Sequence, residues 1–225
     1  MKWVKSEVNF VEDVNATQII DKVEFACRTC YQSYDKVTEG SGEKLIRSCI
    51  SRGHESILEH AAVSFKIVCD RGVSHELVRH RIASYSQEST RYCNYGKEKY
   101  NSELTFVYPW WWDDNLLYES SMEQVVKWYL LNDACRNAES IYLNMIERGA
   151  TPDEARAVLP NALKTTVVCT MNLRELRHFI KLRGSRYAHP DIRCIAREML
   201  KQLRDAGLGV FFEDIHFEEV DGSKV

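Results

Sequence analysis

The sequence of 225 residues contains no uninterrupted apolar run that approaches the roughly 20 residues of a transmembrane helix. Residues 1–7 lack the apolar stretch of a signal peptide, which makes the cytoplasm the expected compartment. The formal net charge is −3, so no overall basic field would draw the molecule to nucleic acid. No G-x-G-x-x-G turn is present, so a Rossmann-type dinucleotide site is not indicated. We therefore expect a cytoplasmic protein without membrane or nucleic-acid partners, in which any anion site is a local cluster.

The sequence also lacks the regular spacing of a disulfide framework, although it has eight cysteines. Without an export signal, we expect free thiols in a reducing compartment. One pair, Cys27 and Cys30, forms a Cys-x-x-Cys motif that could bind zinc or act as a redox dithiol. No second cysteine pair or His-x-x-His accompanies it, and it falls on a helical pattern. We interpret both residues as helix thiols and predict no metal site.

Apolar periodicity predicts one α+β domain. Helical patterns cover 15–33, 43–52, 73–81, 122–148, 172–183 and 190–204. Strand patterns cover 61–69, 105–108 and 167–171, and a long polar loop covers 84–100. No repeat, low-complexity tract or linker is present, so we expect a single domain over 1–225 with its core in about 15–215.

Three tryptophans, Trp110, Trp111 and Trp112, follow Pro109 in a row. Three adjacent side chains of this size cannot all face one core, whether they lie in a strand or in a loop. We expect at least one to lie at an interface or over a ligand, with subunit packing favoured over a substrate lid.

The most informative stretch runs from Arg79 to Arg91 and holds four cationic or potentially cationic side chains with several hydroxyl groups. Burying such charge is costly unless each group finds an opposite charge or full hydrogen bonding, which an anionic ligand would supply. The alternative is a solvated basic turn. The spacing favours a ligand, because an Arg-His-Arg triplet is followed after seven residues by Ser89.

This spacing resembles the signature of the flavin-dependent thymidylate synthases. Other segments are similar to motifs of the same family and occur in the same order. They are Gly53-His54-Glu55-Ser56, Ala155-Arg156-Ala157-Val158-Leu159-Pro160, and Asn172-Leu173-Arg174-Glu175-Leu176 with Leu182-Arg183 and Ile192-Arg193 further on. Together the matches span about residues 50 to 195, which is most of the chain, so the resemblance is specific.

The resemblance implies a fold, a reaction and an assembly. The fold would be a central, mostly antiparallel sheet flanked by helices, forming a single catalytic domain. The enzyme would be a methyltransferase that reductively methylates deoxyuridine monophosphate (dUMP) to thymidylate (dTMP). The carbon donor would be 5,10-methylenetetrahydrofolate, NADPH would supply reducing equivalents through FAD, and tetrahydrofolate would be released. Active sites would lie between the subunits of a homotetramer, which would explain a charged triplet that no single surface could use.

The resemblance also implies which residues bind each ligand. Residues similar to the family's dUMP contacts are Glu76, Leu77, Val78, Arg79, Gln87, Glu88, Ser89, Thr90, Arg91, Arg156 and Arg183. Residues similar to its FAD contacts are His54, Ser56, Arg79, His80, Arg81, Gln87, Asn172, Leu173, Arg174 and His178. On the helix predicted over 73–81, the triplet's side chains would point about 100° apart and could not serve one ligand from one face. The alternative for His54 is a hydrogen-bonded core residue, because a lone histidine is more often that than a ligand contact.

Residues 151–154, Thr-Pro-Asp-Glu, form a capping box with proline at the first helical position, so Arg156 should lie on a short helix. An arginine in the first turn opposes the helix dipole, and we interpret this as support for an anionic partner. The alternative is an exposed surface arginine. Ser89 and Arg91 fall in a loop where a hydroxyl, a guanidinium and backbone N–H groups can converge on a phosphate.

Arg183 is the predicted catalytic residue. Methylation at C5 of uracil requires electron density on that carbon, and a guanidinium beside N3 and O2 would stabilise the developing negative charge. The alternative is an arginine that complements the helix dipole ahead of Gly184. A cysteine nucleophile is another route to the same activation, but no cysteine lies in a motif that would place it there.

Two departures from the family pattern bear on the folate side. Tyr187 stands where many members have histidine, and residues 188–193, Ala-His-Pro-Asp-Ile-Arg, replace a common Ala-Gln-x-Glu-Ile-Arg stretch. Two other functions fit the same residues. One is a flavin reductase that only oxidises NADPH. The other is a nucleotide or nucleic-acid binding module built on the basic stretch, against which the acidic net charge counts.

Overall fold

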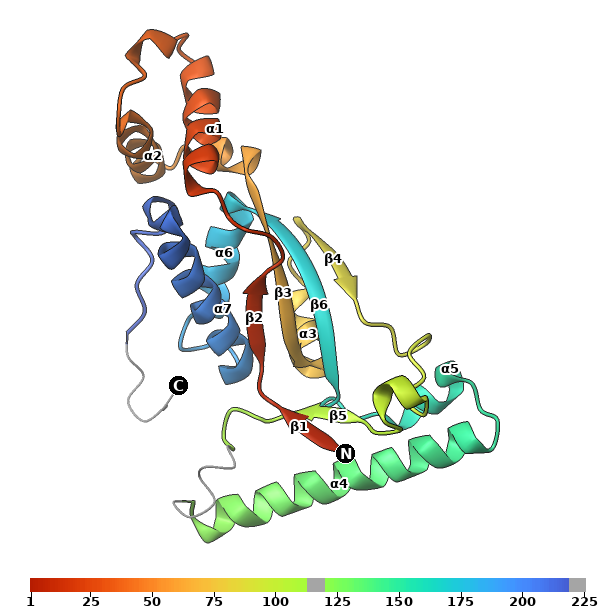
Figure 1. Ribbon diagram of the computed structural model, residues 1–225. Coiled ribbons are helices and arrows are strands. Elements are labelled where there is room, and N and C mark those ends of the chain that lie inside the picture. Colours follow the sequence, from red (N-terminus) through yellow and green to blue (C-terminus); the bar gives the residue numbers. More distant parts are fainter. Residues whose placement is uncertain (113–119, 219–225) are drawn as a thin grey trace. The chain divides into compact units, whose positions relative to one another are not determined.

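The structure is a computed structural model that describes residues 1–112 and 120–218 (Figure 1). The predicted domain span of 1–225 thus includes two segments, 113–119 and 219–225, that lie outside the described residues. The strands are β1 (Lys2–Val4), β2 (Glu7–Phe10), β3 (Ala62–Asp70), β4 (Ala83–Gln87), β5 (Thr105–Val107) and β6 (Lys164–Asn172). The helices are α1 (Ala16–Thr29), α2 (Ser41–Ser51), α3 (Arg71–Leu77), α4 (Met122–Glu147), α5 (Pro152–Ala155), α6 (Leu173–Arg183) and α7 (Pro190–Leu203). None of the helices in these two ranges has the length and apolarity that crossing a membrane requires.

The strands form two sheets. The larger has the strand order β2-β3-β6-β4, and in the smaller β1 pairs in parallel with β5, with Trp3 opposite Phe106. Burial alternates residue by residue along β3 and β6, as it does in antiparallel sheets with one face on a core. The predicted α+β fold with a mostly antiparallel sheet is confirmed.

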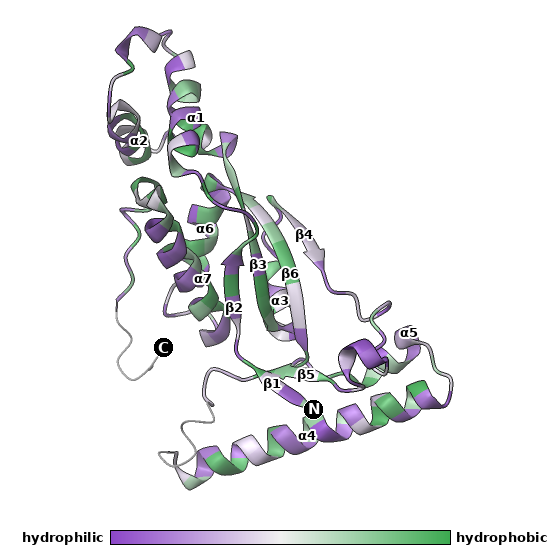
Figure 2. Cartoon of the chain, viewed as in Figure 1, coloured by the Kyte–Doolittle hydropathy of each residue, from purple (hydrophilic) through white to green (hydrophobic). Residues whose placement is uncertain are grey.

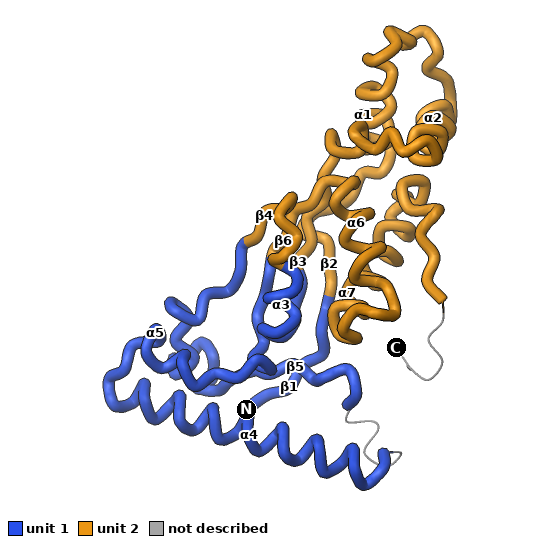
Figure 3. The backbone as a smooth tube through the Cα atoms, turned by 180° about the vertical axis from the view of Figure 1, so that it is seen from behind, with its two compact units in different colours: residues 1–7, 67–77, 86–167 blue, residues 8–66, 78–85, 168–225 orange. Residues whose placement is uncertain are grey.

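The chain folds into two compact units (Figure 3). Unit 1 comprises residues 1–7, 67–77 and 86–167, and unit 2 comprises residues 8–66, 78–85 and 168–225. These stretches alternate along the sequence, so the chain passes between the units repeatedly. The interleaving explains why the sequence shows no linker, since no single boundary separates the units.

The core of unit 2 is built on the apolar faces of α6 and α7 (Figure 2). In α7 the buried positions include Ile192, Ile195, Ala196 and Met199, which recur every three or four residues. Asn172 caps α6 at its N-terminus, and Arg183 is its last residue, as the sequence predicts. The face of α6 that carries the candidate site is therefore fixed by the packing of its opposite, apolar face.

The core of unit 1 lies against the long helix α4. Trp128, Cys135 and Tyr142 are its buried residues, seven positions apart, and Tyr142 packs in a cluster with Phe106. Trp112 is buried and stacks on Trp128, with ring centroids 5.0 Å apart and planes within 7°. Trp110 is exposed. The tryptophan triplet is thus divided between core and surface, as expected, and the interface role of its exposed member stays a prediction.

Two predictions around the Arg-His-Arg triplet are wrong, whereas the other predicted elements are present with slightly different ends. The helix predicted over 73–81 ends at Leu77 as α3, and the triplet follows in a turn. The loop predicted over 84–100 begins with strand β4. The reason is local to unit 2: His80 is buried, and the hydroxyl of Tyr85 in β4 donates to the His80 carbonyl at 2.9 Å. These contacts turn the chain where the helical pattern would have continued.

Candidate functional site

Three of the residues predicted to bind FAD line one cavity in unit 2, with a volume of about 510 Å³. Arg174 and His178 are four residues apart and share a face of α6, and Asn172 caps the helix beside them. The Oδ1 atom of Asn172 accepts a hydrogen bond from the backbone N–H of Glu175 at 2.8 Å, which fixes the start of the helix. A cavity of this size is typical of sites for small organic ligands.

The Gly-His-Glu-Ser motif supplies another side of this cavity. Glu55 and Glu59 lie on the short helix Glu55–His60 and line the cavity together with α6. Arg174 donates to Glu59 at 2.6 Å. His54 precedes the short helix, Ser56 lies on it, and both are exposed. Two motifs far apart in sequence therefore belong to one site. The sequence analysis did not predict a role for either glutamate. Glu55 lies within the motif and Glu59 follows Glu55 by four residues, a spacing that can bring two helical side chains to one side.

His80 is buried in the middle of a hydrogen-bonded chain in unit 2. Its Nδ1 lies 3.1 Å from Oε1 of Glu175, and Nε of Arg183 donates to its Nε2 at 3.1 Å. A guanidinium N–H can only donate, so Nε2 is the acceptor and Nδ1 carries the proton that is donated to Glu175. Burial lowers the pKa of His80 and the charge of Arg183 lowers it further, against the opposing effect of Glu175. The neutral imidazole is the form that satisfies both neighbours.

The two arginines of the triplet differ from its histidine in their exposure to solvent. Arg79 and Arg81 are exposed. Neither makes a hydrogen bond or ion pair with any residue in 1–112 or 120–218. The triplet is thus divided by a turn, with His80 facing inward, rather than by the angular spacing of a helix. Their predicted contacts with flavin and nucleotide stay predictions.

The residues around His80 have the composition of a metal site, but both ring nitrogens of His80 are already hydrogen-bonded. Atoms of His80, Glu175 and His178 lie within 4.8 Å of one another, close enough to share an ion. Both nitrogens of His80 already have partners, one of them a guanidinium. An ion at His80 would have to displace Glu175 or Arg183, and it would meet the positive charge of Arg183. The hydrogen-bonded chain is the arrangement that this chemistry favours.

In unit 1, two arginines from distant stretches meet at one carboxylate oxygen. The Nε atoms of Arg91 and Arg156 lie 3.2 and 3.1 Å from Oδ1 of Asp153. The Oγ atom of Ser89 accepts a hydrogen bond from the backbone N–H of Arg91 at 3.3 Å. All three charged side chains are about half exposed. Two guanidiniums directed at one oxygen have the chemistry to bind an oxyanion such as phosphate, and whether they do so stays a prediction.

The position of Arg156 differs from the expected one. The capping box is present, since Thr151 and Glu154 exchange hydrogen bonds in both directions. The helix it begins has only four residues, and Arg156 is the C-cap. The expectation that Arg156 lies in the first turn and opposes the helix dipole is therefore wrong, because Arg156 stands at the end of the helix. Its guanidinium pairs with Asp153. Its convergence with Arg91 is the better indication of an anion site.

Gln87 and Glu88 are tied into unit 1 by their own hydrogen bonds. Nε2 of Gln87 donates to the hydroxyl of Ser74 at 2.9 Å. Glu88 accepts from the hydroxyl of Tyr95 at 2.9 Å and from Nζ of Lys164 at 2.7 Å. These contacts hold the end of β4, from which the loop toward Ser89 departs. A ligand that binds either side chain would have to share these partners.

The predicted ligand contacts divide between the units. Unit 1 holds Glu76, Leu77, Gln87, Glu88, Ser89, Thr90, Arg91 and Arg156 of the dUMP set, and unit 2 holds Val78, Arg79 and Arg183. The whole FAD set except Gln87 lies in unit 2. The side chains of Leu77 and Leu173 are buried, so a ligand could reach only their backbone. The two units therefore differ: unit 1 has a pair of arginines on one carboxylate oxygen, and unit 2 has a polar cavity and a guanidinium–imidazole pair.

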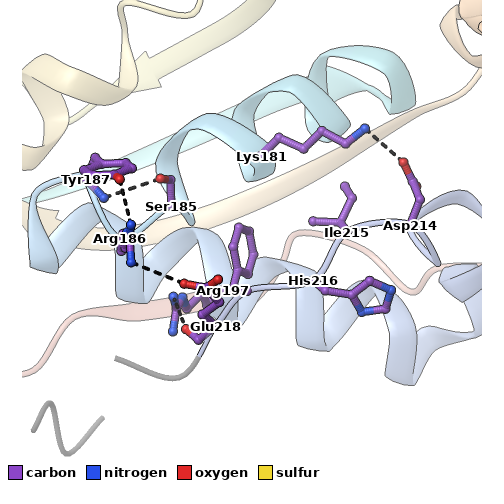
Figure 4. A pocket seen from close by; sticks show the side chains of 10 residues that line it. Lys181, Ser185, Arg186, Tyr187, Arg197, Asp214, Ile215, His216 and Glu218 are labelled. Atoms are coloured by element: carbon purple, nitrogen blue, oxygen red, sulfur yellow. Dashed lines mark hydrogen bonds and ion pairs between the residues drawn. The ribbon is translucent and has the colours of Figure 1, made fainter. Parts of the chain in front are cut away.

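A second cavity of unit 2, also of about 510 Å³, lies beside the C-terminal end of α6 (Figure 4). Two of its cations are paired, Lys181 with Asp214 at 2.9 Å and Arg186 with Glu218 at 3.3 Å. Tyr187 is 84% exposed, and its hydroxyl accepts a hydrogen bond from Arg186 at 2.8 Å. The residue that departs from the family pattern thus lines this cavity and leaves its ring accessible.

The model of the family described as thymidylate synthase complementing protein matches residues 14–206. The chain belongs to this family. A relative from Pyrococcus furiosus named flavin-dependent thymidylate synthase is 42% identical over 173 residues. The match covers 76% of this chain and 66% of the relative, so the chain spans slightly less than two thirds of the relative's length. A relative of the same name from Mycolicibacterium vanbaalenii is 39% identical over 218 residues, 90% of this chain and 82% of that one. The resemblance carried by the motifs is confirmed.

The fold of this family member is also found in a solved structure. The UMP/dUMP methylase PolB from Streptomyces cacaoi, crystallised with 5-Br dUMP, matches with a TM-score of 0.74 and 25% sequence identity. The match covers 95% of this chain and 97% of PolB. A protein that acts on pyrimidine nucleotides therefore shares nearly the whole architecture.

Proposed function

We propose that this protein is a flavin-dependent thymidylate synthase, a methyltransferase that converts dUMP to dTMP. It uses 5,10-methylenetetrahydrofolate as the carbon donor and NADPH, through FAD, as the reductant, and releases tetrahydrofolate. Family membership and the names of the relatives support the reaction, and the similarity to PolB supports a pyrimidine nucleotide as substrate. In this proposal both units belong to one catalytic domain, which acts in the cytoplasm as a homotetramer with active sites between subunits.

The observation that carries the substrate class is the convergence of Arg91 and Arg156. Their Nε atoms lie 3.2 and 3.1 Å from one oxygen of Asp153. A phosphate offers the same kind of oxygen with more charge and with the geometry that a guanidinium fork prefers. In the proposed complex the dUMP phosphate replaces the Asp153 carboxylate between the two arginines, and the hydroxyl of Ser89 donates a further hydrogen bond to it.

In this proposal the cavity at the N-terminal half of α6 holds the flavin. It offers an amide, a guanidinium and an imidazole from Asn172, Arg174 and His178, which suit the phosphates and the polar ring edge of such a group. These three residues would hold FAD together with the other predicted contacts of the FAD set. When bound, the flavin supplies the reducing hydride. The residues of this chain orient it and balance its charge.

Arg183 is the proposed catalytic residue. Its guanidinium would lie beside N3 and O2 of the pyrimidine and stabilise negative charge as C5 becomes nucleophilic. Arginine is suited to this role because it stays charged at all relevant pH values. Its Nε–H is already held by His80 at 3.1 Å. The orientation of the guanidinium is therefore set within unit 2 without help from the nucleotide, and such preorganisation lowers the cost of charge stabilisation.

The test is the conversion of dUMP to dTMP by the purified protein with FAD, 5,10-methylenetetrahydrofolate and NADPH. We expect a yellow protein, formation of dTMP, and NADPH oxidation that is quickened by dUMP. NADPH oxidation that ignores dUMP and yields no dTMP would identify a flavin reductase instead. A colourless protein that cannot be reconstituted with flavin would contradict the proposal.

A further inference from the structure

Glu175 is a buried carboxylate without a role in the proposed chemistry. It is 7% exposed and lies in the first turn of α6, where its own backbone N–H is capped by Asn172. A carboxylate is rarely buried to this degree unless it has a partner. Its partner is Nδ1 of His80, 3.1 Å away. Glu175 is thus one hydrogen-bonded step from the imidazole that holds Arg183.

The imidazole between them is held on more than one side. The His80 ring stands edge-on to the ring of Phe179, with centroids 4.9 Å apart and planes at 76°. The hydroxyl of Tyr85 donates to the His80 carbonyl at 2.9 Å. The plane of the ring is therefore fixed by packing. Packing does not determine which ring nitrogen carries the proton, and this depends on the hydrogen bonds that the ring makes.

We propose that Glu175 is a positioning residue: by accepting the Nδ1 proton of His80, it keeps Nε2 as the acceptor that orients the Arg183 guanidinium. The inference rests on the proposed function, because it concerns the role of Arg183 toward the pyrimidine. If Nδ1 lost its acceptor, the proton could move to Nε2. The Nε2–H group would then face the Nε–H of Arg183, two donors in contact, and the guanidinium would turn away.

Among residues 1–112 and 120–218, the charged and titratable groups that act on the His80 ring are Glu175, Arg183 and His178. Glu175 favours a proton on the ring, while burial, Arg183 and His178 oppose a second one. A doubly protonated ring would carry a hydrogen on Nε2 and lose its contact with Arg183. The proposed chain therefore works with a neutral His80 and fails when acid protonates it.

Two substitutions separate the hydrogen-bond acceptor from the charge. Glu175→Gln keeps an oxygen that can accept from Nδ1, and Glu175→Leu has a similar size but no acceptor. In the dTMP assay with saturating ligands, kcat should fall in the order wild type, Gln, Leu, by about 100-fold for Leu, as expected when a catalytic group is misplaced by about 1 Å. The KM for dUMP should change less than kcat in either variant, because Arg183 is only one of the proposed dUMP contacts and acts mainly on charge that develops during the reaction.

The pH profile supplies a readout that a merely structural role would not change. Because Glu175 raises the pKa of His80, its replacement by glutamine should move the acid limb of kcat to lower pH. A general loss of structure would scale the whole profile without moving the limb. The tautomer can be observed directly by ¹⁵N NMR of histidine-labelled protein, with His80 assigned through His80→Gln. We expect protonated Nδ1 in the wild type and a mixture of tautomers in Glu175→Leu.

The matched control is Glu24→Gln. Glu24 is 5% exposed and accepts from Arg28 at 2.7 Å and from Ser41 at 2.6 Å, on α1 and outside the site. This variant should lose thermal stability but keep its kcat and its acid limb. Wild-type values of kcat, acid limb and tautomer in both Glu175 variants would overturn the inference alone. A wild-type protein that forms no dTMP would instead overturn the proposed function, and the NMR measurement would still decide whether Glu175 sets the tautomer.

Discussion

Arg177 binds both carboxylate oxygens of Asp214, with Nη1 2.7 Å from Oδ1 and Nη2 2.8 Å from Oδ2. Arg177 is 2% exposed, so its charge is almost entirely removed from water. Such a two-pronged pair is among the strongest hydrogen-bonding arrangements in proteins. It fastens the segment after α7 to the middle of α6, the helix that carries Glu175 and Arg183.

Asp214→Asn should destabilise the fold. The substitution removes one of two carboxylates paired with the buried guanidinium, since Glu55 also lies 3.2 Å from its Nε. It leaves at least one N–H group of Arg177 poorly satisfied, which costs about 1–3 kcal/mol. The free energy of unfolding from urea titration measures the loss. Glu213→Gln is the control, because Glu213 pairs with Arg47 on the surface, where both side chains are about half exposed. Equal effects of the two substitutions would contradict the importance given to Arg177.

The same pair predicts how stability depends on pH. The Arg177 guanidinium holds the pKa of Asp214 well below its usual value, so the unfolded chain takes up this proton more readily than the folded one. The stabilisation is therefore complete above about pH 5 and is lost progressively as the pH falls further. Unfolding measured between neutral and acid pH should show this decline in the wild type and a smaller one in Asp214→Asn. A variant that retains the full acid dependence would show that other carboxylates cause it.

The phosphate site in unit 1 predicts a ligand-specific loss of affinity. Arg156→Met should weaken dUMP binding by about 1.5–3 kcal/mol, or roughly 10- to 150-fold, because a charge-assisted contact is lost. Binding of deoxyuridine, which has no phosphate, should not change. Calorimetry with both ligands measures the difference. Arg148→Met is the control, since Arg148 is exposed and its Nε donates to Oδ1 of nearby Asn144 on α4 at 3.1 Å. Equal losses for both ligands would argue against a phosphate contact.

The sequence predicts best where one short stretch determines its own structure. Asn172 begins α6 and Arg183 ends it, because an asparagine cap and a helical apolar stripe are both local signals. The capping box at Thr151 is present for the same reason. The length of a helix depends less on such local signals. The short helix after Thr151 stops after four residues, and this places Arg156 at its end and not in its first turn.

The partners inside the site could not be predicted in this way. His80 and Glu175 are 95 residues apart, and nothing near either one shows that they meet. The burial of His80 also explains why the helix predicted over 73–81 ends early, since a long-range contact overrides a local periodicity. The motifs indicated which segments form the site. The hydrogen bonds that link them depend on the tertiary fold.

Arg183→Ala should reduce dTMP formation to a small residual rate while the protein keeps its flavin. The predicted FAD set does not include Arg183, so the yellow colour and the flavin spectrum should remain. The loss of a group that stabilises developing charge costs about 100- to 1,000-fold in kcat by analogy with oxyanion-hole donors. Arg47→Ala is the control, because Arg47 is exposed and pairs with Glu43 and Glu213. Unchanged turnover in Arg183→Ala would remove this residue from the proposed mechanism.

The thiols of the Cys-x-x-Cys motif should differ in reactivity. Cys27 is buried with its Sγ 3.2 Å from Sγ of Cys49, and burial, with the nearby thiol, raises the pKa of Cys27 to about 12. It therefore stays protonated at neutral pH, and a protonated thiol is a poor nucleophile. Cys30 is exposed at the end of α1. Iodoacetamide should alkylate Cys30 in the native protein and spare Cys27 and Cys49 until the chain unfolds, as peptide mass spectrometry can measure.

Cys30→Ser should remove the label from this stretch, and Cys27→Ser should leave it in place. Because the two thiols of the motif have different surroundings, a zinc chelator should not change the melting temperature. Rapid native labelling of Cys27, or a chelator-dependent drop in melting temperature, would show that the two cysteines act as a pair. The packing between α1 and α2 argues against that pairing, since the thiol in contact with Cys27 belongs to Cys49.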